Sequence, residues 1–222
     1  MSTIQEDFDR IALVSPDGAT HNDHYHNFLL RYLPSNCLEA LDIGCGTGSF
    51  ARCLAERLQH VTALDLSPEM IRIARERSAN FLNIDFKLAD VRNWVLADES
   101  FDCIASIATL HHLPIEEMLL KMKAALKPGG VLLILDLFEP AGLADSFANL
   151  LALPVSTVLR LRHHGLLPQR EVRAAWTAHE RHDSYSTMSE VHTLAERILP
   201  GAKIRKHLLW RYSLVWEKKS DG

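Results

Sequence analysis

The sequence Leu41-Asp42-Ile43-Gly44-Cys45-Gly46-Thr47-Gly48 joins a short apolar run to a segment typical of a helix. The apolar run begins at Leu38 and has the composition of a strand that is buried on both faces. The three glycines let the backbone approach a ligand without Cβ obstruction, and the following helix offers unpaired N–H groups. This stretch therefore predicts a strand, a ligand-binding loop and a helix in succession.

From Leu38 onward, short apolar runs alternate with amphipathic stretches, a pattern typical of βαβ units in a parallel sheet. The runs predict five parallel strands, at residues 38–43, 60–64, 84–88, 101–106 and 131–137. Two more candidate strands near the C-terminus are separated by few residues, which predicts an antiparallel pair at the sheet edge, at 203–208 and 212–218. Between the helix expected at 115–126 and the fifth strand, Lys127-Pro128-Gly129-Gly130 predicts a turn.

The glycine spacing separates this loop from two other nucleotide-binding loops. It reads G-x-G-x-G, whereas the dinucleotide fingerprint reads G-x-G-x-x-G, and it lacks the Gly-Lys-Ser/Thr ending of a P-loop. Residues 42–48 resemble motif I of the class I S-adenosylmethionine-dependent methyltransferases. Residues 101–114 and 126–131 are also similar to regions of that family, so the resemblance covers about half of the chain, residues 38–137.

The resemblance and the candidate strands together define the expected fold. We expect an α/β, Rossmann-like, doubly wound protein with a mostly parallel seven-stranded sheet, an antiparallel edge strand and a helical cover. A chain of 222 residues fits one domain. Its expected parts are an N-terminal helical cap (1–37), a cofactor-binding core (38–140), a helical substrate cover (141–188), and a final helix with the edge strands (189–222).

Two acidic residues follow the second and third strands. Asp65 ends the second strand, where a carboxylate can accept hydrogen bonds from both ribose hydroxyls; its alternative role is to cap the helix that begins at Ser67-Pro68. For Asp90 and Val91, at the end of the third strand, the resemblance implies that Asp90 accepts from the adenine amino group and that Val91 lies near the ring. An exposed turn is the alternative for Asp90.

Asp42 lies in a strand expected to be buried on both faces, where an acid is costly unless it is hydrogen-bonded. It is expected either to orient the loop or the cofactor's ammonium group, or to bond backbone amides of the turn. The resemblance implies a set of cofactor-binding residues from the loop and the following strand ends: Asp42, Gly44, Cys45, Gly46, Asp65, Leu66, Met70, Asp90, Val91 and Ile107.

The implied cofactor is S-adenosyl-L-methionine, with S-adenosyl-L-homocysteine as the product. Its sulfonium makes the methyl carbon electrophilic, so the protein mainly has to align a nucleophile in line and exclude water. No catalytic residue is assigned by the sequence. His111, His112 and Tyr25 are candidate bases, since histidine titrates near neutrality, and packing is the alternative role of the histidine pair.

Composition limits the partners. A net charge of -4 and a pI near 6.3 argue against a general nucleic-acid binder. No apolar stretch reaches the roughly 20 residues of a bilayer helix, and the four cysteines form no C-x-x-C pair, so we expect a cytoplasmic protein with reduced thiols. The histidine clusters at 21–26 and 163–164 lack metal-ligand spacing, so no metal is expected.

The expected function is methyl transfer to a small molecule of unidentified structure, in an oligomeric state that the sequence leaves open. One alternative is a nicotinamide-dependent oxidoreductase, favoured by the shared fold and by Asp65 but opposed by the glycine spacing. The other alternative is a methyltransferase-like protein that binds the cofactor or a partner without turnover, because methyl transfer needs no obligatory side chain.

Overall fold

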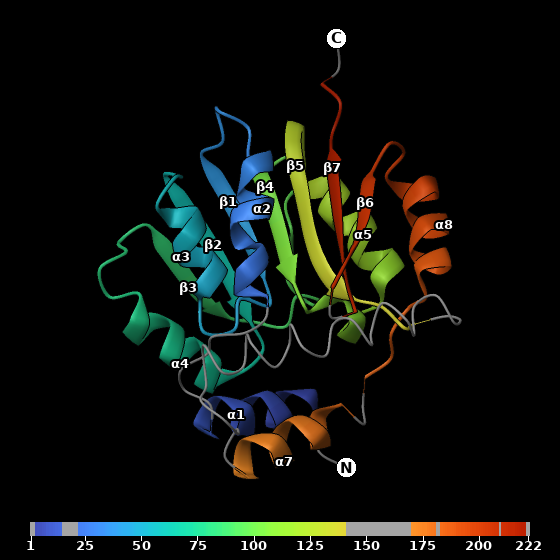
Figure 1. Ribbon diagram of the computed structural model, residues 1–222. Coiled ribbons are helices and arrows are strands. Elements are labelled where there is room, and N and C mark those ends of the chain that lie inside the picture. The colour runs from blue at the N-terminus through green and yellow to red at the C-terminus, as the bar shows by residue number, and fades with distance from the viewer. Residues whose placement is uncertain (1–2, 15–21, 141–169, 181–182, 209, 221–222) are drawn as a thin grey trace.

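One twisted sheet organises the chain in the computed structural model, which describes residues 3–14, 22–140, 170–180, 183–208 and 210–220 (Figure 1). Across these residues the sheet has seven strands in the order β3-β2-β1-β4-β5-β7-β6. Their bounds are β1 (Glu39–Ile43), β2 (His60–Asp65), β3 (Ile84–Leu88), β4 (Phe101–Ile107), β5 (Leu126–Leu137), β6 (Lys203–His207) and β7 (Arg211–Glu217). The first five strands are mutually parallel, and β7 runs antiparallel to both of its neighbours. The expected Rossmann-like, doubly wound sheet is confirmed.

The turn expected at Lys127-Pro128-Gly129-Gly130 is wrong, because these residues belong to β5. Phe101 pairs with Leu126 but Cys103 pairs with Val131, so the extra residues form a bulge within the strand. Gly129 has φ +76°, and its N–H donates to the carbonyl of Lys218 at 2.7 Å. The glycine therefore keeps the strand paired with the C-terminal segment where a turn would have ended it.

Helices cover both faces of the sheet. One hydrophobic cluster packs α5 (Ile115–Ala125) and α8 (Met188–Ile198) on one face, and a second packs α2 (His26–Leu29), α3 (Ser49–Ala55) and α4 (Pro68–Arg77) on the other. The strands between them are buried: Leu41, Ile104 and Leu132 are each 0% exposed. This burial on both faces explains their continuous apolar sequences.

A third group of helices lies at one end of the sheet. Helix α1 (Ile4–Val14) packs against α7 (Arg170–His179) and α4, and an apolar cluster that includes Ile11, Met70 and Ala175 joins them. Figure 1 shows α1 and α7 beyond the end toward which the parallel strands point. Helix α7 falls within the expected cover at 141–188, of which residues 141–169 and 181–182 lie outside the described residues.

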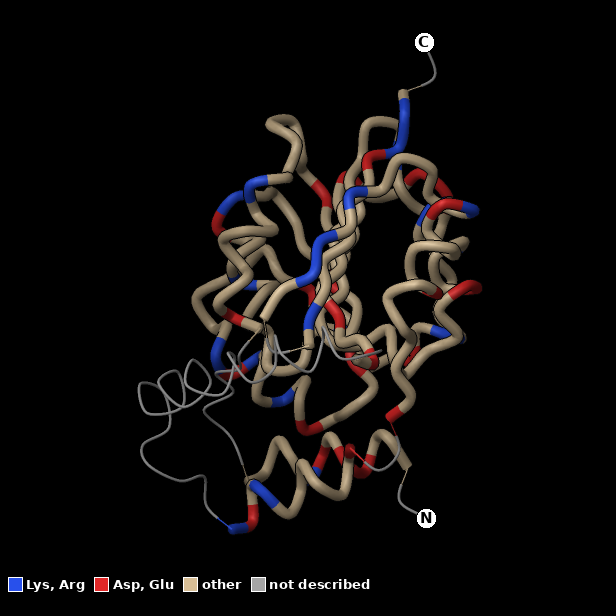
Figure 2. Tube along the Cα trace, turned by 45° about the vertical axis from the view of Figure 1, so that its right-hand side comes forward, with Lys and Arg blue, Asp and Glu red and all other residues tan. Residues whose placement is uncertain are grey.

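The exposed edge of the sheet is basic. Lys203, Arg205 and Lys206 lie on the edge strand β6, and Figure 2 shows basic residues along the sheet edge that faces the viewer. Charged side chains on an edge strand discourage pairing with another chain. Among the described residues, none of the helices combines the length and the apolar character that crossing a membrane requires.

Two adjacent leucines of α5 test this packing. Leu119 is 2% exposed, whereas Leu120 is 50% exposed. We expect Leu119→Ala to lower the free energy of unfolding by about 3 kcal/mol, because it leaves a cavity in the core. Leu120→Ala, the matched control, should change it by less than about 1 kcal/mol. Urea denaturation measures both, and equal losses would contradict the burial of this face of α5.

Candidate functional site

The glycine loop follows β1 and turns back toward β2. The N–H groups of Gly44 and Cys45 both donate to the carbonyl of Leu64 at 2.9 Å, which fixes the start of the loop. A Cβ on Gly44 would lie 2.1 Å from the Thr109 hydroxyl, so a side chain there would collide with the segment after β4. Gly46, with φ +52°, has no heavy atom within 4 Å of the corresponding position. Protein atoms therefore fill the space beside Gly44, whereas the space beside Gly46 is free for a ligand.

Asp65 binds this loop at the end of β2. Its carboxylate accepts from the N–H of Gly46 at 2.8 Å and from the N–H of Ser67 at 2.9 Å. The second bond agrees with the alternative role at the start of α4, where the Ser67 hydroxyl also accepts from Met70 N–H at 3.1 Å. Burial raises the pKa of Asp65 above its ordinary value. A carboxylate has about four acceptor sites, and these backbone N–H groups do not use all of them.

Asp42 is the least satisfied carboxylate near the loop. It is 1% exposed, and its Oδ2 atom has no hydrogen-bond partner within the described part of the chain. Burial, with a smaller contribution from the charge of Asp65, raises the pKa of Asp42 to about 7. A buried acceptor without a donor is expensive, so this position suits a ligand that brings N–H groups.

Asp90 is turned toward its own neighbour Arg92. The guanidinium donates to both carboxylate oxygens, with Nη2 to Oδ2 at 2.7 Å, and lowers the pKa of Asp90. Val91 is 6% exposed and packs in the core cluster on the α5 face. A hydrogen bond from adenine to Asp90 would have to replace, or be added to, the hydrogen bonds from the Arg92 guanidinium.

The remaining expected contact residues lie around the same strand ends. Cys45 is buried, which raises the pKa of its thiol and keeps it protonated. Met70 packs beneath α1, Ile107 is half-buried at the end of β4, and Leu66 is half-buried directly after Asp65. These side chains supply apolar surface beside the loop.

The histidine pair lies in a 3₁₀ turn, η3 (Leu110–His112), that follows β4. Asp136, near the end of β5, accepts from the backbone N–H of His111 at 3.0 Å and lies 2.6 Å from His111 Nδ1. This contact fixes the ring of His111. Burial, with the neighbouring rings of His111 and His179, lowers the pKa of His112 to about 3, so His112 is uncharged at neutral pH.

Both histidines line a cavity of about 330 Å³ at this end of the sheet, within the usual size range of small-ligand pockets. Its walls combine apolar and polar side chains: Ile4, Leu110, His111, His112, Leu113, Ile115, Asp136, Leu137, Ser184, Ser186 and Tyr212. Tyr25, the third candidate base, is not among these residues. Its hydroxyl donates to the carbonyl of Leu208 at 3.2 Å, and its ring packs against His207.

Sequence reasoning missed three polar residues of this region: Asp136, His179 and Asp183. Asp136 interrupts the apolar strand at 131–137, and a lone charge in a doubly buried strand is a usable signal. His179 and Asp183 have i, i+4 spacing, and the side chains of both are less than 5% exposed. Only the fold brings them beside the histidine pair.

Comparison with known proteins gives the family. A model of a methyltransferase domain matches residues 40–130, which include the glycine loop, Asp65 and Asp90. An N-methyltransferase from Bradyrhizobium japonicum, solved in complex with S-adenosyl-L-homocysteine, superposes with a TM-score of 0.65 over 98% of this chain and 99% of its own, at 17% identity. The domain match, the related sequences and the shared fold together support a class I S-adenosylmethionine-dependent methyltransferase.

Related sequences agree with this assignment. An uncharacterized methyltransferase of Mycobacterium tuberculosis is 29% identical over 198 residues, which cover 88% of this chain and 94% of that protein. A demethylmenaquinone methyltransferase of Tropheryma whipplei is 35% identical over 113 residues, covering 50% of this chain and 47% of that protein. The similarity to the first protein thus extends beyond the core to most of the chain, whereas the similarity to the second protein is confined to about half of it.

The residues near the loop fit the cofactor of this methyltransferase family. The space beside Gly46 admits a ligand, and the unpaired Asp42 Oδ2 suits an ammonium group. Asp65 keeps lone pairs for hydroxyl donors. These features support the cofactor on structural grounds, independently of the sequence match.

The pKa of Asp42 predicts a pH dependence of stability. In the folded methyltransferase this pKa is about 7, against about 3.9 in an unfolded chain. Above about pH 4 the Asp42 carboxyl has lost its proton in the unfolded chain but keeps it in the folded one. Rising pH therefore favours unfolding until it passes the pKa of the folded state. Between about pH 5 and pH 8, the unfolding free energy should fall by roughly 2.5 kcal/mol more in the wild type than in Asp42→Asn. Chemical denaturation of cofactor-free protein measures this, and parallel pH profiles would contradict it.

Proposed function

We propose that this methyltransferase transfers the methyl group of S-adenosyl-L-methionine to a small molecule by in-line displacement at the sulfonium methyl, leaving S-adenosyl-L-homocysteine. One observation supports the proposal above all: three features lie together where β1 and β2 end. They are the open glycine loop, the buried Asp42 with its unpaired Oδ2 atom, and Asp65. The parallel pairing of Ile43 with Leu64 supports it, because it keeps the two carboxylates at the same end of the sheet.

Each expected contact residue then has a role in binding. The glycine loop lies against the amino-acid end of the cofactor, which enters the open space beside Gly46, and Asp42 accepts from its ammonium group. Asp65 accepts from the ribose hydroxyls, which provide directional, charge-assisted hydrogen bonds. Asp90 accepts from the adenine amino group. Apolar contacts to the nucleoside and the methionine chain come from Leu66, Met70, Val91 and Ile107.

The methyl acceptor binds in the cavity lined by His111 and His112. Its volume of about 330 Å³ suits a small molecule. Thr109 connects this cavity to the glycine loop, since its side chain contacts Gly44 and its backbone carbonyl accepts from His112 N–H at 3.1 Å. Helix α1 contributes Ile4 to the cavity wall and so helps to exclude water, which protects an electrophilic methyl group from hydrolysis.

The same proposal covers the whole chain as a single methyltransferase domain that acts in the cytoplasm. The apolar cluster joining α1, α4 and α7 supports one domain, because the N-terminal cap packs on the core and on the cover. The four cysteines are free thiols, and reduced thiols are typical of a cytoplasmic protein.

Asp65 tests the cofactor site. We expect Asp65→Ala to raise the dissociation constant of S-adenosyl-L-homocysteine at least about 100-fold, because two charge-assisted bonds to the ribose are lost. Asp85→Ala is the matched control: Asp85 lies on the neighbouring strand β3 and pairs with Lys87 at the surface. Calorimetry measures both affinities. Since Asp65 also binds Gly46 and Ser67, a thermal melt must show that the variant is folded, and a folded variant with wild-type affinity refutes the proposal.

Isotope transfer tests the acceptor class. Protein incubated with a whole-cell extract and S-adenosyl-L-methionine that carries a labelled methyl group should label the low-molecular-mass fraction, because a cavity of about 330 Å³ suits a small acceptor. Heat-inactivated protein is the control. Label found only in protein or nucleic acid would contradict a small-molecule acceptor, and no label in any fraction would favour a non-catalytic binding protein.

A further inference from the structure

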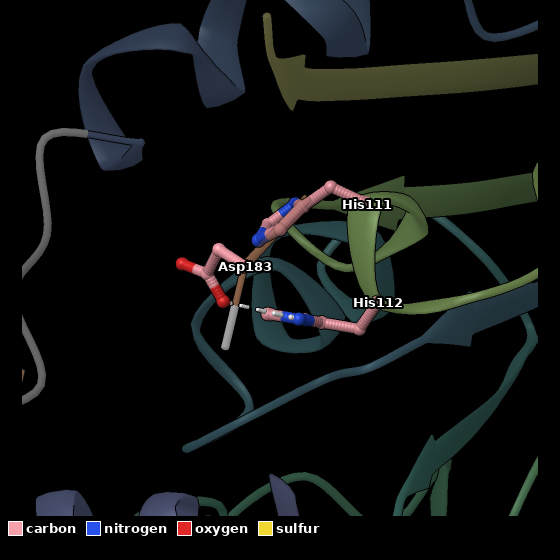
Figure 3. Close-up of side chains that lie close together, drawn as sticks. All are labelled: His111, His112 and Asp183. Atoms are coloured by element: carbon pink, nitrogen blue, oxygen red, sulfur yellow. Dashed lines mark ion pairs between the residues drawn. The ribbon is translucent and has the colours of Figure 1, made fainter. Parts of the chain in front are cut away.

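A cluster of buried polar side chains beside the cavity is only partly hydrogen-bonded. It consists of His111, His112, His179 and Asp183, which come from η3, the last residue of α7 and the segment that follows α7. Figure 3 shows the ion pair between Asp183 and His112 as a dashed line, with the imidazole of His111 beside them. The four side chains are between 3% and 6% exposed. Their polar atoms must therefore be satisfied inside the protein or by a bound ligand.

The atoms that remain unsatisfied are specific. Asp183 Oδ2 accepts from the Tyr185 hydroxyl at 2.5 Å, but buried Oδ1 has no hydrogen-bond partner in the described ranges. Buried His112 Nε2 and His179 Nδ1 likewise have no hydrogen-bond partner there, and Asp7 lies 3.9 Å from the latter. Of these atoms, Asp183 Oδ1 is the one that faces the other ring nitrogens of the two histidines, His112 Nδ1 and His179 Nε2. A buried carboxylate oxygen without a donor is costly unless a ligand completes it.

Distances argue against charge-assisted hydrogen bonds as the explanation. The contact between His111 and the neighbouring Asp136 has the length of a charge-assisted hydrogen bond, with Nδ1 and Oδ1 2.6 Å apart. Asp183 Oδ1, in contrast, lies 3.4 Å from His112 Nδ1 and 3.6 Å from His179 Nε2. A protonated imidazole paired with a carboxylate closes to about 2.7–2.9 Å. The histidines around Asp183 are within ion-pair distance of it but too far away for a charge-assisted hydrogen bond.

We propose that His111, His112, His179 and Asp183 bind a divalent first-row transition metal ion, with Zn²⁺ as the best fit. Ligand atoms about 2.0–2.1 Å from a tetrahedral zinc ion lie about 3.4 Å from one another. The separations of 3.4 and 3.6 Å around Asp183 Oδ1 match that spacing. The ligand atoms of His111, His112 and Asp183 lie within 4.8 Å of one another, and His179 joins this set through its contact with Asp183.

The surroundings are those of a metal site. Asp136 is bonded to His111 Nδ1, which leaves Nε2 to carry the lone pair, as in carboxylate–histidine–metal arrangements. Asp183 forms no ion pair with a Lys or Arg in the part of the chain that the structure describes, so a cation would balance a buried negative charge. Phe8 of α1 covers the site, with its ring 4.6 Å from His179 and 5.5 Å from His112.

Sequence spacing alone predicts no metal here, because 67 positions separate the histidine pair from His179. In this arrangement the pair serves as metal ligands rather than as general bases. Because His111 and His112 also line the cavity, the ion would lie beside the methyl acceptor and could bind one of its oxygens as a Lewis acid. That last role rests on the proposed function, whereas metal binding does not.

Metal titration of the tag-free, chelator-treated chain tests the site. We expect one Zn²⁺ per chain by calorimetry at micromolar protein, one Co²⁺ with the visible absorption of a tetrahedral ion, and a higher melting temperature with either metal. Asp183→Asn keeps the shape of the side chain but should weaken binding more than about 100-fold, since a charged ligand is lost. His192→Gln, at an exposed histidine of α8, is the matched control and should bind like the wild type.

Two results would overturn the proposal: no stoichiometric binding of either ion by the wild type, or equal binding by Asp183→Asn and His192→Gln. If Asp183→Asn fails to fold, His179→Gln replaces it with the same expected loss. Asp65→Ala separates this site from the cofactor site, because it should lose nucleoside affinity and keep the metal. A chain that binds metal but not S-adenosyl-L-homocysteine refutes only the proposed function, and the reverse result refutes only the metal site.

Discussion

The parallel pairing of β1 with β2 on one side and β4 on the other is the constraint on which the rest of the structure depends. Strands that run in the same direction end at the same edge of the sheet, so the loops that follow them must meet there. Ile43 pairs with both Leu64 and Ser106, which sets the glycine loop between Asp65 and the segment leading to the histidine pair. A one-residue change in either register would reverse which side chains face the core and would separate these groups.

Buried carboxylates at this edge are satisfied in different ways. Asp136 is bonded by His111 and by the N–H of Leu137, and Asp65 is bonded by backbone N–H groups of the loop and of the start of α4. Asp42 and Asp183 each keep one buried oxygen without a donor. Because unpaired buried acceptors are costly, the fold by itself satisfies the first pair, whereas the proposed ligands would complete the second pair.

Helix α1 links the two proposed sites. It packs on α4 beside the glycine loop through Ile11, and it covers the histidine cluster with Phe8. Its Ile4 also reaches the cavity between them. The position of α1 depends on its packing against these neighbours, so a ligand at either proposed site can change that position. Helix α1 therefore contacts the surroundings of both proposed sites.

The sequence by itself determined the sheet, the glycine loop and the carboxylates at the strand ends, because these follow from local periodicity and from residues close together in the chain. It misjudged residues 127–130, since whether a Pro-Gly-Gly segment turns or bulges depends on the neighbouring strand, here the C-terminal segment at Lys218. Only the tertiary structure decided that Asp136, His179 and Asp183 gather around the histidine pair. Contacts between distant residues leave no local pattern, because the fold rather than the spacing in the chain brings their side chains together.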